Sequence, residues 1–405
     1  MIGTVTVDAR ISDWVVQRVV RRVMGPLVPL TATVAALLVG AAMVWGFGGD
    51  PVEGYRAMFT GAFGGISEFA DTTVKATPLL LVGVGICIAF RASVINIGGE
   101  GQIIAGALLS TVVVLALPDL HRGALLPLAL IAGAVGGACM GFIPGVLKAY
   151  ANVNEILSTI MLNIVAGYMM QYLLLGPMID KEAVEAGNHI AQTKRLSPNS
   201  DLPILLGDTQ MNLGIVIGAV VAIGAFFLLW RTSLGYEIRA VGGSKDASRY
   251  AGMKVERRIV QALTLSGMMS GLGGAVLVFS SVAHRLSVES GPAGFTQLAG
   301  FNGIVAALFG GLHPLWTIPA AILFGGLLVG ANALQRAVQV ATPLVVALSG
   351  LVVVFVVSSD RAVRWARHLG ERFDIGASPE HDRTGSAASG GADAPTTPSG
   401  EGAEP

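Results

Sequence analysis

Three polar clusters interrupt an apolar chain, and their side chains suit hydrogen bonding rather than covalent chemistry. The first is Asn96-Ile-Gly-Gly-Glu100-Gly-Gln102. Irregular backbone at membrane depth is tolerated only where it is buried in protein or lines a watery cavity. Glu100 is costly there unless it is paired or hydrated, and Arg91 is the nearest cation in the sequence. The cluster predicts a broken or re-entrant helix start at a cavity or an interface; a solvated surface loop is the alternative.

The second cluster opens another apolar run and ends at Asn163. Asn154 can cap a helix that begins at Glu155, whose carboxylate then lies at the positive end of the helix. Glu155, Thr159 and Asn163 recur at every fourth residue and therefore share one helix face. Such a stripe either lines a solute path or forms hydrogen bonds with a neighbouring helix. The sequence leaves both interpretations open.

The third cluster places Gln297 and Asn302 among glycines at the start of a later apolar run. It resembles the first cluster in kind, as the two halves of a transporter repeat would. The two segments do not align residue for residue, so the pattern indicates a repeat only weakly.

Motifs for catalysis and for nucleotide binding are absent from the sequence. It contains no G-x-x-x-x-G-K-[ST], no H-E-x-x-H and no C-x-x-C, so we expect neither ATP hydrolysis nor a cofactor or metal in this chain. Lys+Arg and Asp+Glu balance at 26 each, which gives no electrostatic case for a nucleic-acid partner. Cys87 and Cys139 both fall in apolar runs, where we expect buried small hydrophobes rather than a disulfide.

The elements that carry these clusters are predicted to be membrane helices. The chain is 53% hydrophobic and only 13% charged, about half the charge of a soluble domain. A spanning helix needs about 20 mostly apolar residues. The predicted fold class is all-α, a polytopic membrane protein with about ten transmembrane helices, some of them broken or re-entrant. The apolar runs are 27–46, 74–90, 97–117, 124–146, 155–175, 212–230, 262–282, 296–312, 315–334 and 340–358.

One basic segment, 231–261, divides the sixth run from the seventh. Placing it and both termini in the cytoplasm leaves 18 of the 26 Lys and Arg residues inside, as the positive-inside rule requires. Within it, Gly242-Gly243 can turn the chain and Ser244 can cap a short helix. Asp246 would lie in the first turn, and Gly252 can close the helix. A short capped helix on the cytoplasmic face is a docking surface.

The chain divides into three parts. Residues 1–26 predict an amphipathic helix on the inner leaflet, with a disordered basic arm as the alternative. Residues 27–358 form the transmembrane domain with the loop 231–261. Residues 359–405 form a cytoplasmic tail that we expect to be disordered from about 376, because its composition cannot bury a core.

With these motifs the chain resembles a permease of ATP-binding cassette (ABC) importers, in the family that includes branched-chain amino acid, ribose and nucleoside permeases. The resemblance covers residues 75–358. It is carried by NIGGEGQ (96–102), NVNEILSTIMLN (152–163), GYEIRAVGGSKDASRYAGM (235–253) and GFTQLAGFNGIVAALFGG (294–311). The first two motifs are most similar to the nucleoside branch. Ser244 stands where an Asn is usual, and Asn302 where the family often has Asp.

The resemblance implies that the central loop carries a coupling helix, which fits a groove on a separate ATPase that binds ATP and Mg. It also implies a second permease subunit and an extracytoplasmic substrate-binding lipoprotein, in a plasma membrane. The candidate ATPase-coupling residues are Gly235, Arg239, Ala240, Gly242, Gly243, Ser244, Asp246, Ala247 and Gly252. The candidate substrate-pathway residues are Asn96, Glu100, Gln102, Asn154, Glu155, Thr159, Asn163, Gln297 and Asn302.

Nucleosides are the first expectation for the cargo, since an amide-rich interior suits a neutral, hydrogen-bonding solute. Simple sugars and branched-chain amino acids are the alternatives. An ion-coupled secondary transporter is the rival class, and Glu100 and Glu155 are its only good intramembrane candidates. A polytopic enzyme is disfavoured by the scatter of its His, Asp and Cys residues.

Overall fold

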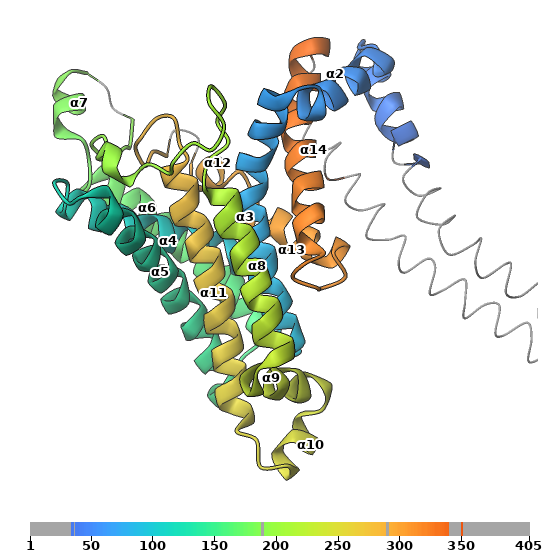
Figure 1. Cartoon of the computed structure of the whole chain (residues 1–405), viewed down its shortest axis with the longest axis vertical. Helices are drawn as coiled ribbons and strands as arrows, with labels where there is room; N and C mark the ends of the chain where they lie inside the picture. Colours follow the sequence, from blue (N-terminus) through green and yellow to red (C-terminus); the bar gives the residue numbers. More distant parts are fainter. Residues whose placement is uncertain (1–33, 36, 188–189, 289–290, 340–349, 351–405) are drawn as a thin grey trace, which may run out of the picture.

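The chain is a polytopic membrane protein, and its described part is all-α. The computed structural model describes residues 34–35, 37–187, 190–288, 291–339 and 350 (Figure 1). Within these ranges, seven helices are long and apolar enough to cross a membrane. They are α3 (Ile66–Arg91), α4 (Gly99–Ala116), α5 (Arg122–Ala151), α6 (Glu155–Leu175), α8 (Gly214–Arg231), α11 (Val255–Phe279) and α14 (Thr317–Val338).

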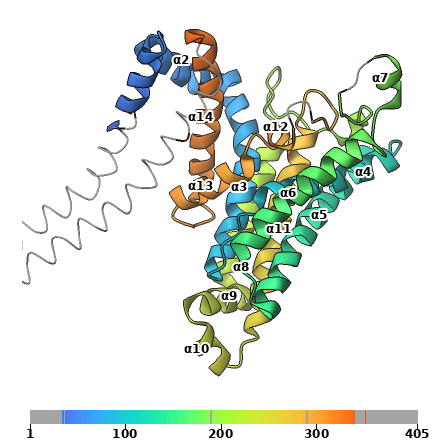
Figure 2. The same cartoon turned by 180° about the vertical axis from the view of Figure 1, so that it is seen from behind.

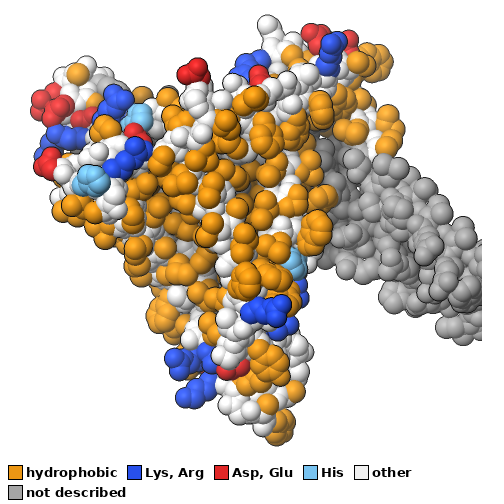
Figure 3. Space-filling model, viewed as in Figure 1, with side chains coloured by type: hydrophobic (Ala, Val, Ile, Leu, Met, Phe, Trp, Pro, Cys, Tyr) orange, Lys and Arg blue, Asp and Glu red, His pale blue; other side chains and the backbone are white. Residues whose placement is uncertain are grey.

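Shorter elements complete the described part of the chain. The described elements besides the spans are an apolar helix Leu37–Gly46, α2 (Pro51–Phe63), α7 (Lys181–Glu185), the 3-10 turn η1 (Pro198–Ser200), α9 (Ser233–Gly243), α10 (Lys245–Tyr250), α12 (Pro292–Thr296) and α13 (Ala299–Phe309). In Figure 1, α9 and α10 lie together at the lower, narrow end, and α2, α7 and α12 lie at the opposite end. Figure 3 shows a broad hydrophobic surface between the two ends and Lys and Arg side chains near α9 and α10.

The predicted apolar runs agree with the helices except at the eighth. There the structure has two short helices, α12 and α13, in place of one span over 296–312. They are separated by Gln297 and Leu298, whose φ angles of 51° and 58° are left-handed and therefore interrupt a helix. Residues 27–33 and 36 of the predicted first run fall outside the described residues, as do all of the last run except residue 350, the N-terminal segment 1–26 and the tail 359–405.

The spans differ greatly in how much protein covers them. Helix α3 is central: 83% of its apolar window is buried, compared with 22% in α6. Figure 2 shows α6 on the near side of the bundle in that view, over α4, α5 and α11. Cys87 in α3 is buried as predicted, whereas Cys139 in α5 is exposed on the bundle surface, so that part of the prediction was wrong. Neither cysteine forms a disulfide in this structure.

Helices α5 and α11 pack through glycines that let their backbones touch. A Cβ atom added to Gly271 would overlap the carbonyl oxygen of Gly133, and one added to Gly137 would overlap that of Gly267. Small residues allow this close approach between membrane helices. The hydrophobic effect does not drive helices together within the bilayer, because lipid tails are also apolar, so van der Waals contact stabilises their association.

The first prediction follows from this contact. Gly271→Ala is expected to destabilise the bundle by about 1–3 kcal/mol, because the added methyl group overpacks the α5–α11 interface. Gly224→Ala in α8 is the matched control, since its Cβ would meet nothing within 4 Å. Both changes raise helix propensity equally, so the difference in thermal unfolding temperature in detergent isolates the packing effect. Equal unfolding temperatures would contradict the packing explanation.

Candidate functional site

Helices α9 and α10 form the segment that the sequence singled out as a docking surface. The Ser244 side chain accepts a hydrogen bond from the Ala247 amide at 3.3 Å, so the predicted N-cap of α10 is confirmed. Asp246 lies in the first turn of α10, and Gly252 follows the helix with a φ of +78°. Asp246 and Ala247 are exposed and free for contact with another protein.

The glycine pair does not turn the chain, contrary to the sequence interpretation. Gly242 and Gly243 form the last turn of α9, and the chain turns at Ser244. A Cβ atom on Gly242 would overlap the carbonyl oxygen of Arg91, whereas one on Gly243 would meet nothing within 4 Å. Gly242 therefore lets α9 lie directly on the end of α3.

Three further contacts hold α9 to the bundle. The Ser93 hydroxyl donates to the Gly242 carbonyl at 2.6 Å. Arg258 of α11 forms a 2.7 Å ion pair with Glu237, and this hydrogen bond holds the pKa of the Glu237 carboxyl below its ordinary value. Gly235 packs against the main chain of Leu228. The other two predicted residues, Arg239 and Ala240, are half-buried on α9.

The segment that follows α3 is held by a network of buried amides. Asn96 Nδ2 donates to Ser266 Oγ at 2.8 Å and to Gln102 Oε1 at 3.0 Å. Asn96 Oδ1 accepts from the Gly98 amide at 2.8 Å. The exposed fractions of Asn96 and Gln102 are 0% and 2%, so these two predicted pathway residues shape the loop from within the protein.

Glu100 caps a helix that belongs to a distant part of the chain. Its Oε1 accepts from the amides of Gly300 and Phe301 at 2.8 and 3.3 Å. The N-cap position of α13 is Leu298, which has no side chain able to accept a hydrogen bond, so Glu100 of α4 supplies the missing acceptor. Arg91, the expected partner, instead donates to the Leu312 carbonyl at 3.1 Å. That expectation was wrong because main-chain amides satisfy the carboxylate.

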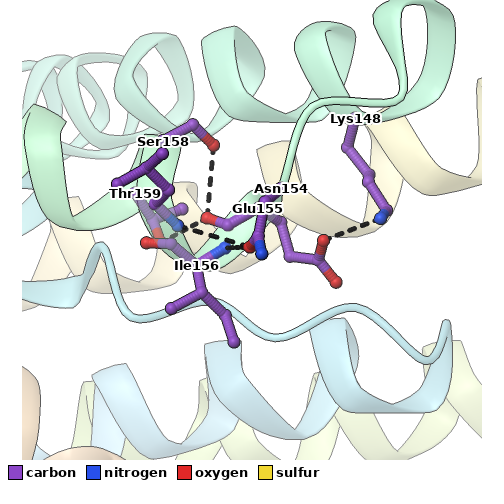
Figure 4. A network of polar contacts seen from close by, with 7 residues as sticks. Lys148, Asn154, Glu155, Ile156, Ser158 and Thr159 are labelled. Atoms are coloured by element: carbon purple, nitrogen blue, oxygen red, sulfur yellow. Dashed lines mark hydrogen bonds and ion pairs between the residues drawn. The ribbon is translucent and has the colours of Figure 1, made fainter.

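The polar stripe of α6 starts with a conventional cap. The Asn154 side chain accepts from the amides of Ile156 and Leu157 at 2.9 and 3.4 Å, as predicted. Figure 4 shows Glu155 turned toward Lys148 of α5, with which it forms a 2.8 Å ion pair. The Thr159 hydroxyl donates back to the Glu155 carbonyl at 2.7 Å.

Asn163 is the end of this stripe and reaches the first cluster. Its Oδ1 accepts from the Gly101 amide at 2.8 Å, and its Nδ2 donates to the Ile97 carbonyl at 2.9 Å. The second cluster is therefore bonded to the first. The third cluster joins them through Gly300 and Phe301, so the structure brings all three together.

The two predicted residues of the third cluster differ in their surroundings. Gln297 lies at the break between α12 and α13, and its Oε1 accepts from Lys75 Nζ of α3 at 2.9 Å. Asn302 is half-buried in the first turn of α13, and its side chain has no hydrogen-bond partner among the described residues.

A groove of about 450 Å³ opens beside these contacts, between α4, α6, α12 and α13. Glu100 and Asn163 lie at its inner wall, and Tyr168, Gln171 and Phe301 extend it. Sequence reasoning missed Gln171, which continues the spacing of four residues from Asn163, and Tyr168, which lies one turn after Ile164 on the neighbouring face of α6. In the part of the chain that the structure describes, no group of three His, Cys, Asp or Glu residues is placed to hold a metal ion.

Comparison with known proteins assigns a family to this arrangement. Residues 69–357 match the family described as the branched-chain amino acid transport system permease component. The chain belongs to this family. It is a permease of an ABC importer, a transport subunit and not an enzyme.

Three relatives show how far the similarity extends. The nucleoside ABC transporter permease NupB of Lactococcus lactis is 34% identical over 75% of this chain and 83% of its own length. The guanosine ABC transporter permease NupP of Bacillus subtilis is 34% identical over 84% and 95%. The glucose ABC transporter permease TsgB13 of Haloferax volcanii is 32% identical over 85% and 90%. The permease family is therefore shared along most of the chain.

Proposed function

We propose that this permease imports nucleosides and that an ATPase subunit, which binds ATP and Mg, docks on α9 and α10. The support is a continuous series of contacts from this segment to the groove. Gly242 contacts Arg91 and Ser93, which lead into residues 96–102. Glu100 then contacts α13, and Gly101 contacts α6 through Asn163. A displacement of α9 is thereby passed to the two helices that border the groove.

The membrane topology proposed here has ten spans, with α12 and α13 together forming one broken span that leads from the outer pocket to the end near α9. The runs 27–46 and 340–358 supply the first and the last span. The end with α9 and α10 is cytoplasmic, as are both termini, because the basic residues gather there.

A second permease subunit is proposed to pack on α6. Ile160, Ile164, Tyr168 and Tyr172 form an exposed stripe along this helix, with exposed fractions from 38% to 71%. The groove opens beside this stripe and is lined by Glu100. Exposing its carboxyl group to lipid tails would be energetically unfavourable. A second subunit facing the stripe would enclose the groove as a pathway.

The substrate-binding lipoprotein is proposed to act at the opposite end of the bundle. A polar pocket of about 480 Å³ lies there, and its walls include Asp71, Lys75, Arg285 and Arg336. Lys75 also bonds Gln297 at the α12–α13 break. Solute released into this pocket would therefore meet the break that leads to the groove.

The cargo assignment depends on the relatives and on the groove. Two relatives with 34% identity are named for nucleosides and guanosine. Tyr168 and Phe301 give the groove aromatic surface on which a nucleobase can stack, and Gln171 can form hydrogen bonds. The glucose permease at 32% identity makes a simple sugar the second candidate.

Uptake by the complete importer tests this function. Cells that express the permease with its ATPase and binding protein should accumulate labelled guanosine or adenosine, and excess unlabelled glucose should not compete. Competition by glucose with no competition by nucleosides would favour the sugar. Uptake of solute by the purified permease alone, driven by an ion gradient, would contradict the ATP-driven mechanism.

The groove itself yields a second prediction. Tyr168→Leu is expected to lower nucleoside uptake about three- to tenfold, since stacking on an aromatic ring contributes on the order of 1 kcal/mol. Tyr168→Phe keeps the ring and should keep most of the uptake. Phe142→Leu on α5, which is also exposed but lies away from both the groove and the docking segment, is the control. Equal uptake in all three variants would exclude a stacking role for Tyr168.

A further inference from the structure

Cationic side chains surround one tryptophan where α8 meets α9. The guanidinium carbons of Arg91 and Arg239 lie 5.2 and 5.7 Å from the centroid of the Trp230 ring. The His313 ring centroid lies 4.9 Å from the same ring. These four residues, the arginine–tryptophan cluster, come from the end of α3, the end of α8, α9 and the turn before α14. Nothing in the coupling contacts described above uses this arrangement.

The positive charge of the arginine–tryptophan cluster is not balanced by the described protein. Neither arginine takes part in any of the ion pairs between described residues. The Nε atoms of both arginines and Nδ1 of His313 are buried without a hydrogen-bond partner there. Burial and the nearby Arg91 charge both lower the pKa of His313, which agrees with a positive local potential. Half-buried charges of one sign are costly unless an anion approaches them.

The position of the cluster favours a lipid as the source of that anion. Trp230 lies one residue before the end of the apolar helix α8, and tryptophans are enriched at the ends of membrane helices, where the bilayer meets water. Phe227 and Ile223, on the same face of α8 one and two turns further into the membrane, are 54% and 44% exposed. An acyl chain can lie along this stripe while its phosphate reaches the cluster. A free phosphate would use the cations and leave the stripe uncovered.

We propose that the arginine–tryptophan cluster binds the phosphate of an anionic phospholipid headgroup. A guanidinium group presents a planar fork of N–H donors that matches phosphate oxygens, and the Trp230 ring holds both forks in place. Because Arg239 belongs to α9 and Arg91 to α3, the bound phosphate would tie the coupling segment to the bundle. The proposal concerns lipid binding by this chain and does not depend on which solute is carried.

Quenching of Trp230 fluorescence tests the proposal on the full chain. The other tryptophans, Trp14, Trp45, Trp316 and Trp365, are changed to Phe, and the protein is reconstituted in phosphatidylcholine vesicles. Brominated phosphatidylglycerol should quench at about one-tenth the membrane fraction that brominated phosphatidylcholine requires. Arg239→Gln should remove this preference, and Arg239→Lys should reduce it. Arg257→Gln, which removes an exposed charge from the same end, should retain it.

Three results would overturn the proposal. The first is equal quenching by the two brominated lipids in a protein whose unfolding temperature matches that of the wild type. The second is loss of the preference on addition of inorganic phosphate, which would assign the site to a free anion. The third is a large gain in quenching when residues 376–405 are deleted, which would assign it to the acidic residues of that tail.

Discussion

Glu100→Ala is expected to reduce solute uptake at least tenfold while the ATPase subunit remains bound. The substitution removes the acceptor for the amides of Gly300 and Phe301 at the start of α13. Each buried amide left without a partner costs about 1–3 kcal/mol, so the α12–α13 break loses the contact that fixes it. The left-handed φ angles of Gln297 and Leu298 add to that cost, because non-glycine residues adopt them only when their surroundings hold them.

The ratio of ATP hydrolysed to solute imported, measured in proteoliposomes with the complete importer, checks this prediction. Hydrolysis without import is expected, because the ATPase still moves α9 while α13 no longer follows α4. Glu100→Gln keeps a side-chain oxygen of the same reach and should retain uptake within a few-fold. A fall of both activities together, with a lower unfolding temperature, would indicate a purely structural role. Normal uptake in Glu100→Ala would contradict the capping argument.

Gly242→Ala is expected to lower solute-stimulated ATP hydrolysis and uptake about tenfold. The added methyl group overlaps the Arg91 carbonyl, so α9 must move away from α3 and lose the hydrogen bond from Ser93. Helix propensity alone predicts the opposite sign, since alanine stabilises a helix by about 1 kcal/mol relative to glycine. The experiment therefore separates the tertiary contact from the local preference.

Gly243→Ala is the matched control for this change. It adds the same methyl group one residue later in the same helix, where nothing lies within 4 Å. Hydrolysis and uptake are measured for both variants in the complete importer, together with the amount of ATPase that co-purifies. Similar activity in the two variants would mean that the α9–α3 contact does not transmit motion.

The positions of the membrane helices and of the coupling segment were predictable from the sequence. Hydropathy is a local property, so the predicted run 155–175 coincides with α6, and the cap at Ser244 was found from residue type and spacing. The family resemblance rested on four local motifs, and the match over 69–357 confirms it. The prediction of one continuous helix over the eighth run was wrong. The helix is interrupted by left-handed φ angles at Gln297 and Leu298, and neither residue is a glycine that would have indicated such a conformation.

Only the tertiary structure decided what the polar residues contact. The partners of Glu100 are main-chain amides 200 residues away, and those of Asn163 are main-chain groups more than 60 residues away. Almost every residue has a main-chain amide, so no pattern of side chains in the sequence identifies which amide will donate to a given carboxylate or side-chain oxygen. Likewise, Arg91, Trp230 and His313 meet because three helix ends converge. The sequence determined which polar residues need a hydrogen-bond partner because they lie in apolar segments. The packing of the helices determined which group serves as the partner of each one.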